Sequence, residues 1–147
     1  MKGENKVFKD DILEIYIDGA SRNNPGKGAC AYIFVLNDEI IFKQSAYLGD
    51  ITNNQAEYTA LINALDKAIE YTRWIIKVYS DSELVVNQMN GKWRVKDTLI
   101  KELYRQASQK EMGIKSIEYL HVPRTNKFIG LADDLCSDCI DKNIGNK

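Results

Sequence analysis

Histidine and cysteine are scarce in this sequence, which holds one histidine and three cysteines among 147 residues. An odd number of cysteines without disulfide-like spacing is typical of a reducing compartment, where Cys30 serves as a small core residue. Cys136 and Cys139 have the spacing of half a zinc site, but no second pair accompanies them. We therefore expect these two cysteines to pack within a helix, and we expect no redox function.

Long apolar runs are also lacking. No stretch approaches the roughly 18 uninterrupted apolar residues that a membrane-spanning helix needs. Residues 1–11 are charged and lack the apolar segment of a signal peptide. We expect a cytoplasmic protein with no membrane partner.

Positive charge is not in excess, because the formal net charge is −1. This balance argues against a generally basic nucleic-acid binder, since phosphate attraction normally requires a cationic surplus. An enzyme that gathers carboxylates around metal ions is an exception, because the ions themselves meet the phosphates. Hydrophobic residues make up 44% and charged residues 28%, as in ordinary globular proteins. We expect a single domain over residues 1–147, with its core in about residues 12–141.

Apolar periodicity and turn signals predict an α/β fold with the element order βββαβααβα. Three antiparallel strands come first, and the later strand, helix and strand imply a parallel crossover. Thr52 or Asn53 can cap the first helix, and Asp97 or Thr98 can start the third. The predicted strands are 12–18, 29–36, 40–48, 74–80 and 117–122, and the predicted helices are 52–71, 81–90, 97–112 and 131–141.

Three carboxylates are predicted to meet. Asp18 and Asp81 each stand where a strand gives way to a loop or helix, the edge at which open α/β sheets bind ligands. Glu57 shares the inward stripe of its helix with Ala60 and Leu61. A carboxylate facing the core is unfavourable unless it is paired or bound to a cation, and no Lys or Arg lies on that stripe. Hard oxygen ligands without a nearby histidine favour Mg²⁺ or Mn²⁺ over zinc.

Each acid also has a structural explanation. Asp81 can be a helix cap and Asp18 a turn former. A fourth acid, Asp133 or Asp134, begins the last predicted helix, where the helix dipole favours negative charge. The combination, more than any single acid, indicates phosphate chemistry.

Four motifs in this order resemble ribonuclease H type 1. The resemblance spans most of the chain and implies a five-stranded mixed sheet flanked by helices. It also implies that Asp18, Glu57, Asp81 and Asp133 form an acidic quartet that is catalytic and binds two Mg²⁺ ions, with Mn²⁺ as an alternative. The motifs are Asp18-Gly19-Ala20-Ser21 with Asn24-Pro25-Gly26-Lys27-Gly28, Thr52-Asn53-Asn54-Gln55-Ala56-Glu57, Ser80-Asp81-Ser82 and Ala132-Asp133-Asp134-Leu135.

The family hydrolyses the RNA strand of RNA/DNA hybrids and leaves 5′-phosphate and 3′-hydroxyl ends, so the resemblance implies an endonuclease that binds such a hybrid. Asn24, Asn53, Asn54 and Gln55 match positions that contact the hybrid, and uncharged amides suit the minor groove. Turn formation and helix capping also explain these residues, as readily as contact does for Asn24 and Asn53, whereas the exact match of Asn54 to the family favours contact there. We expect the protein to be a monomer.

The sequence departs from the family in three places. His121 belongs to a strand and does not replace the mobile-loop histidine of many relatives, so we do not assign it a catalytic role. Ile129 stands where the family has an asparagine, and Asn126 lies earlier, which implies a small insertion and leaves Asp134 as an alternative to Asp133. Only residues 92–96 stand where some members have a basic protrusion, and Trp93 can bind nucleic acid or cover the edge of the core.

Overall fold

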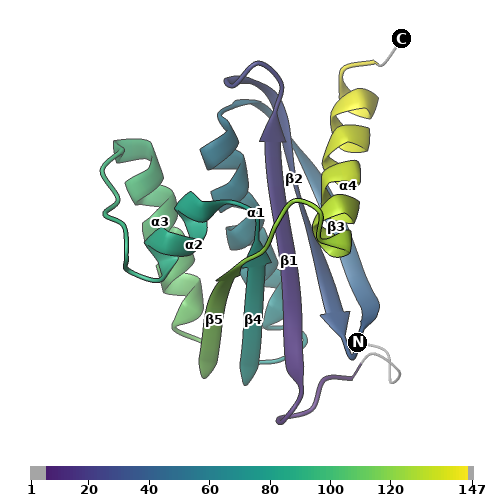
Figure 1. The fold of residues 1–147 in the computed structure, drawn as a ribbon, viewed down its shortest axis with the longest axis vertical. Helices are drawn as coiled ribbons and strands as arrows, with labels where there is room; N and C mark the ends of the chain where they lie inside the picture. Colours follow the sequence, from purple (N-terminus) through teal and green to yellow (C-terminus); the bar gives the residue numbers. More distant parts are fainter. Residues whose placement is uncertain (1–5, 146–147) are drawn as a thin grey trace.

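A five-stranded mixed sheet forms the centre of the computed structural model, which describes residues 6–145 (Figure 1). The strands lie in the order β3-β2-β1-β4-β5. β1 pairs antiparallel with β2, which pairs antiparallel with β3, while β4 is parallel to both β1 and β5. The elements are β1 (Ile12–Ser21), β2 (Gly26–Leu36), β3 (Glu39–Ile51), α1 (Asn53–Ala68), β4 (Ile75–Ser80), α2 (Glu83–Met89), α3 (Thr98–Glu111), β5 (Ser116–His121) and α4 (Lys127–Asn143).

The helices cover the two faces of the sheet unequally. α1 lies across one face with α2 and α3 beside it, whereas α4 alone lies on the other face, over β1, β2 and β3 (Figure 1). The element order βββαβααβα and the mixed sheet confirm the predicted fold class. Among the described residues, no helix combines the length and the apolarity that a membrane crossing needs.

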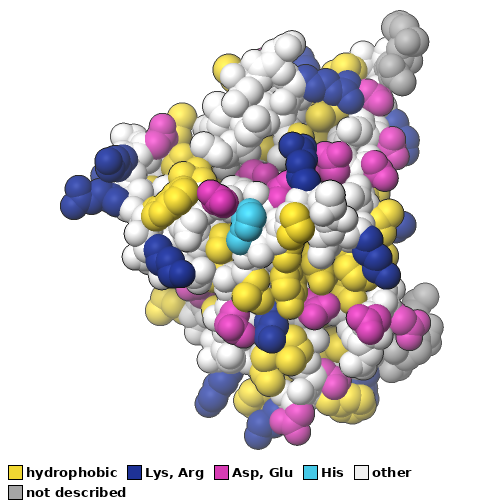
Figure 2. All heavy atoms as spheres, in the orientation of Figure 1, with side chains coloured by type: hydrophobic (Ala, Val, Ile, Leu, Met, Phe, Trp, Pro, Cys, Tyr) yellow, Lys and Arg dark blue, Asp and Glu magenta, His cyan; other side chains and the backbone are white. Residues whose placement is uncertain are grey.

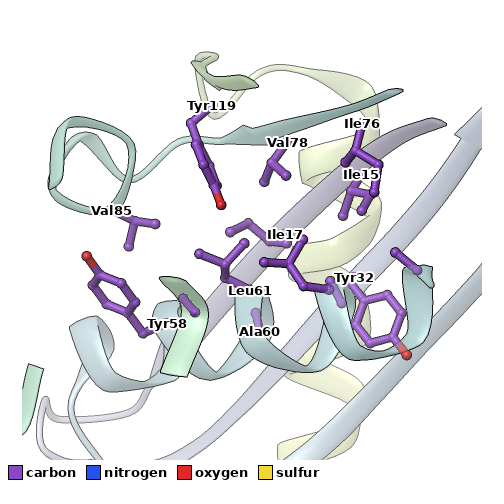
Figure 3. Close-up of a cluster of buried hydrophobic side chains, with 14 of the residues drawn as sticks. Ile15, Ile17, Tyr32, Tyr58, Ala60, Leu61, Ile76, Val78, Val85 and Tyr119 are labelled. Carbon is purple, nitrogen blue, oxygen red and sulfur yellow. The ribbon is translucent and has the colours of Figure 1, made fainter. Parts of the chain in front are cut away.

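Alternation along β1 divides the core into two layers. Ile15 and Ile17 point toward α1 and belong to one cluster with Leu61 and Ile76, as Figure 3 shows. Tyr16, between them in sequence, packs with Phe128 in the layer under α4. β1 is therefore buried on both faces, and a polar side chain in this strand needs a specific partner.

β1 does not end at Asp18, as the sequence predicted, but continues to Ser21. The turn-forming residues after Asp18 stay in the strand because β2 pairs with them, with Gly19 opposite Cys30 and Ser21 opposite Gly28. Gly19 is required there by close packing, since a Cβ at this position would lie 2.3 Å from the backbone carbon of Ala56 in α1. β1 and α1 thus lie in close contact beside Asp18.

The last helix begins four residues before its predicted start, at Lys127 instead of Leu131. Asn126 is its N-cap, and its side chain accepts the backbone N–H groups of Phe128 and Ile129. Gly130 in the second turn favoured a later start, but the burial of Phe128 and Ile129 against the sheet outweighs its weak helix propensity. The other boundaries differ from prediction by at most three residues.

Candidate active site

Three carboxylates from three elements converge at one edge of the sheet. Asp18 lies in β1, Glu57 in the second turn of α1, and Asp81 directly after β4. One carboxylate oxygen from each lies within 4.8 Å of the others. Figure 2 shows acidic side chains gathered beside histidine in the middle of one face, near the ends of β4 and β5. The side chains predicted to meet from their places in the sequence therefore do so.

Two of these carboxylates are withdrawn from water and lack partners. Asp18 is 3% exposed and Glu57 is 8% exposed. The Oδ2 atom of Asp18 and the Oε1 atom of Glu57 are buried without a hydrogen-bond partner. Buried oxygens of this kind are unfavourable unless a cation or donor reaches them. The cluster thus has the donor set that hard divalent cations require.

Burial and mutual repulsion keep protons on this cluster. Burial, followed by the charges of Asp81 and Asp133, raises the pKa of Asp18 to about 8, while the Gly19 backbone N–H opposes the rise. Burial also raises the pKa of Glu57 well above its usual value, with the charges of Asp18 and Asp81 as the next causes. A bound cation would reverse this balance by favouring the ionised forms.

Asp133 lies beside the cluster, and Asp134 lies away from it. Asp133 is partly buried on α4 and close enough to Asp18 to hydrogen-bond with it, which contributes to the raised pKa of Asp18. Asp134 is exposed. Because α4 begins at Lys127, its first turn contains no acidic residue. The predicted stabilisation of a helix start by Asp133 or Asp134 is therefore wrong.

The structural explanations for the other two aspartates also fail. Ser82, not Asp81, is the N-cap of α2, and its side chain accepts the backbone N–H of Val85. Asp18 lies inside a strand, paired with Ala31, and forms no turn. Neither local role accounts for these carboxylates.

Two side chains from the end of β5 and the following loop reach Asp81. The Nε atom of Arg124 lies 3.7 Å from Oδ2 of Asp81, with the Arg124 side chain 79% exposed. The Nε2 atom of His121 lies 3.3 Å from the backbone oxygen of Asp81. Within residues 6–145, Arg124 is the one cation that forms an ion pair with these acids, and its exposed guanidinium is free to turn toward an anionic ligand.

The four amide residues predicted to contact a substrate differ in their surroundings. The Oδ1 atom of Asn24 accepts the backbone N–H of Asn53 at 2.9 Å, and Oδ1 of Asn53 accepts the backbone N–H of Ser21 at 2.8 Å. Gln55 forms a capping box with Thr52, which is the N-cap of α1. Asn54 is exposed, and its side chain hydrogen-bonds to no other part of the described chain. Asn54 is therefore the amide most available to a ligand.

A groove of about 870 Å³ runs from these amides to the connector between α2 and α3. One wall carries Asn24, Thr52, Asn54 and Gln55, and the other carries Lys92, Trp93, Arg94 and Lys96. Trp93 is 45% exposed, so it does not simply cover the core. The short connector therefore presents three cations and an aromatic ring to the groove.

The cysteines take no part in this cluster. Cys30 lies in β2, while Cys136 and Cys139 lie in α4, and all three are free thiols. Within residues 6–145, the one group of three or more metal-type side chains contains no cysteine. Cys136 packs in the core beneath β1, as helix packing predicted, with its Sγ 3.7 Å from the backbone oxygen of Asp18.

Sequence analysis missed Gln88, a buried glutamine at the floor of the groove. It follows the apolar Val85 and Val86 in α2, and a polar residue at an inward helical position was the available signal. The proximity of Arg124 to Asp81 had no comparable local signal, because it depends on how the loop after β5 turns.

The sequence matches the family described as reverse transcriptase-like over residues 16–139. A ribonuclease HI of Halobacterium salinarum is 38% identical over 131 residues, which cover 88% of this chain and 64% of that protein. A ribonuclease H of Campylobacter curvus is 34% identical over 119 residues, covering 78% of this chain and 74% of that protein. The chain spans only 35% of a similar bifunctional protein of Mycobacterium tuberculosis.

Solved structures agree with these sequence matches. The RNase H1 of Halobacterium salinarum superposes with a TM-score of 0.82 at 36% identity, covering 89% of this chain and 98% of that one. LC11-RNase H1, solved in complex with an RNA/DNA hybrid, superposes with a TM-score of 0.83 at 33% identity, covering 90% and 99%. With the acidic cluster and the strand order already described, these matches lead to one conclusion: the chain belongs to the ribonuclease H type 1 family.

Proposed function

We propose that this protein is an endonuclease that hydrolyses the RNA strand of RNA/DNA hybrids in a metal-dependent reaction, leaving 5′-phosphate and 3′-hydroxyl ends. One observation carries the proposal: Asp18, Glu57 and Asp81 converge within 4.8 Å, and two of their oxygens are buried without partners. Structural stabilisation does not account for three acids in contact, because each raises the energy of its neighbours. A site that binds cations and phosphate together does.

Mg²⁺ is the ion that this donor set fits best, with Mn²⁺ as an alternative. All candidate donors are carboxylate oxygens, and no histidine or cysteine side chain belongs to the described cluster. Asp18, Glu57, Asp81 and Asp133 would hold two such ions. When bound, the ions would supply Lewis-acid chemistry that activates the attacking water and stabilises the leaving 3′ oxygen.

The chain's own residues would orient the hybrid around this centre. Arg124 is exposed and 3.7 Å from Asp81, so its guanidinium can exchange the carboxylate for a phosphate oxygen. Asn54 offers an uncharged donor and acceptor to 2′-hydroxyls and base edges, which distinguish RNA from DNA. Asn24, Asn53 and Gln55 would serve mainly by holding Asn54 in place, with their remaining N–H groups facing the substrate.

The connector would contact the backbone of the hybrid. Lys92, Arg94 and Lys96 provide charge for backbone phosphates, and Trp93 provides a stacking surface. This wall is basic although the whole chain carries a net charge of −1. A local cationic surface thus resolves the conflict between the overall composition and a nucleic-acid substrate.

The same proposal includes the organisation of the protein. Residues 1–147 would form one domain that acts as a monomer, with the four acids carried by β1, α1, α4 and the residue after β4. We propose the cytoplasm as its compartment, which rests on the free cysteines.

The test is cleavage of end-labelled RNA/DNA hybrid, double-stranded RNA and double-stranded DNA, each with Mg²⁺, with Mn²⁺ and with excess chelator. Internal cuts in the RNA strand of the hybrid alone, lost with chelator, are expected. Asp81→Asn should abolish these cuts while the far-UV circular dichroism spectrum is unchanged. Binding of the hybrid without cutting under either ion would instead make the protein a noncatalytic binder. Preferential cutting at DNA ends or junctions would assign it to another branch of nucleases.

A further inference from the structure

Gln88 joins three parts of the fold by hydrogen bonds. Its Oε1 atom accepts the hydroxyl of Tyr58 at 2.7 Å, and its Nε2 atom donates to the backbone oxygen of Arg94 at 3.3 Å. Gln88 is 4% exposed and Tyr58 is fully buried. A buried amide is tolerated when both its oxygen and its nitrogen have hydrogen-bond partners. Here the partner of the oxygen lies on α1 and the partner of the nitrogen lies in the connector.

The bond to Arg94 holds the middle of a segment that is otherwise held by backbone hydrogen bonds at its start and by the packing of Val95 against the core. Gly91–Asp97 contains no regular secondary structure, and all of its residues except Val95 are exposed. The backbone N–H groups of Lys92 and Trp93 donate to the backbone oxygen of Asn87. Within residues 6–145, Gln88 is the one side chain from outside the segment that hydrogen-bonds to it. An apolar side chain at this position would fill the core but leave the turn free to shift.

The other end of this chain of bonds lies on α1, the helix that contributes Glu57 to the acidic cluster. Tyr58, which donates its hydroxyl to Gln88, directly follows Glu57, a proposed catalytic residue, in the sequence of α1. The connector's Lys92, Trp93 and Arg94 face Asn54 across the groove. The spacing between the two walls is thereby tied to α1, the helix that carries both Glu57 and Asn54.

We propose that Gln88 is a positioning residue: through its bonds to Tyr58 and Arg94 it fixes the connector at the distance from α1 that an RNA/DNA hybrid requires. The inference rests on the proposed function for its effect on substrate. Gln88 acts through the connector's side chains, so its removal weakens binding without slowing the chemical step. Its effect disappears when those side chains are gone.

A double-mutant cycle tests this role. Gln88→Met keeps the side-chain volume and removes both hydrogen bonds, and we expect the KM for hybrid to rise about fivefold, the size of one typical hydrogen bond, with kcat unchanged. In a protein that already carries Lys92→Ala, Trp93→Ala and Arg94→Ala, the same substitution should leave KM unchanged. Asn87→Ala is the matched control, because it removes a neighbouring amide side chain but keeps the Asn87 backbone oxygen, and it should leave KM unchanged.

Hydrogen exchange separates this inference from the proposed function. The amides of Lys92 and Trp93 should exchange faster in Gln88→Met than in the parent or in Asn87→Ala, whether or not the protein cuts a hybrid. Equal KM increases in both backgrounds would mean that Gln88 contacts the nucleic acid directly, and would overturn the positioning role. A fall in kcat, or unchanged exchange at both amides, would overturn it too. A parent that cuts no hybrid would refute the function alone, and exchange would still decide the role of Gln88.

Discussion

Asn24 and Asn53 join the turn after β1 to the start of α1, with Oδ1 of Asn24 accepting the backbone N–H of Asn53 at 2.9 Å. In the opposite direction, from β1 to α1, the backbone N–H and the hydroxyl of Ser21 both donate to Oδ1 of Asn53. This pair fixes the end of the strand that carries Asp18 against the helix that carries Glu57. Two residues predicted as substrate contacts thus have a structural role that is visible without substrate.

Replacing Asn53 should reduce stability. Asn53→Ala leaves the half-buried backbone N–H of Ser21 without its partner, so the free energy of unfolding should fall by about 1–3 kcal/mol. Urea denaturation followed by circular dichroism measures this directly. Asn54→Ala, one position further on, should leave stability unchanged and raise the KM for hybrid. Equal stability of the two variants would show that the hydrogen bonds between Asn53 and Ser21 contribute nothing to the free energy of unfolding.

The choice between Asp133 and Asp134 can be decided by a matched pair of variants. Asp133→Asn should lower kcat by about a hundredfold or more, because it removes a proposed ligand beside Asp18. Asp134→Asn changes an exposed neighbour and should keep nearly full activity. Initial rates on a labelled hybrid distinguish the two. The opposite pattern would transfer the fourth position to Asp134.

Because β1 and α1 are in close contact at Gly19, adding a single methyl group there should strongly reduce stability. In Gly19→Ala the new Cβ would meet the backbone of Ala56 and Glu57, so stability should fall by about 3 kcal/mol and activity with it. Gly130→Ala in α4 is the control, since a Cβ there meets nothing within 4 Å, and it should add about 0.5–1 kcal/mol. Thermal denaturation of both variants would test the contrast; a stable Gly19→Ala protein would show that α1 can move away.

Without metal, stability should depend on pH through Asp18. Its pKa is raised from 3.8 to about 8 in the folded protein, so the folded state holds a proton that the unfolded state releases. In chelator, the contribution of Asp18 to the free energy of unfolding should therefore be largest below about pH 4 and should decrease as pH rises toward 8. Asp18→Asn should flatten this dependence, whereas Asp134→Asn should not. Urea denaturation at a series of pH values gives the slope, and an equal slope in Asp18→Asn would exclude Asp18 as its source.

Most of the fold was predictable from the sequence because its signals are local. The alternation of Ile15 and Ile17 with Tyr16, and the helical spacing of Leu61 and Leu65, depend only on neighbouring residues. The errors occurred where tertiary contacts override local preference. Pairing with β2 extends β1 beyond Asp18 to Ser21. Burial of Phe128 makes α4 begin at Lys127, before Gly130.

The candidate site was predictable to the extent that the order of strands and helices brings its acids together. Asp18, Asp81 and Glu57 could be expected to meet from topology alone, since each has a definite place on a strand or helix. The use of Asn24 and Asn53 as mutual supports could not, because 29 residues separate them and either side chain could equally face solvent. The same holds for Gln88 and Arg94, whose contact depends on the path of an irregular connector.

The placement of Asp133 on α4 gives the nascent chain a definite order of events. α4 follows the other eight described elements in the chain, and among the described helices it alone covers its face of the sheet. A ribosome-bound chain that ends before Lys127 can carry Asp18, Glu57 and Asp81 but neither the fourth proposed carboxylate nor the cover over β1 and β2. If Asp133 is the fourth ligand, completion of the acidic quartet coincides with closure of the core, so a nascent chain becomes competent only after α4 has been synthesised.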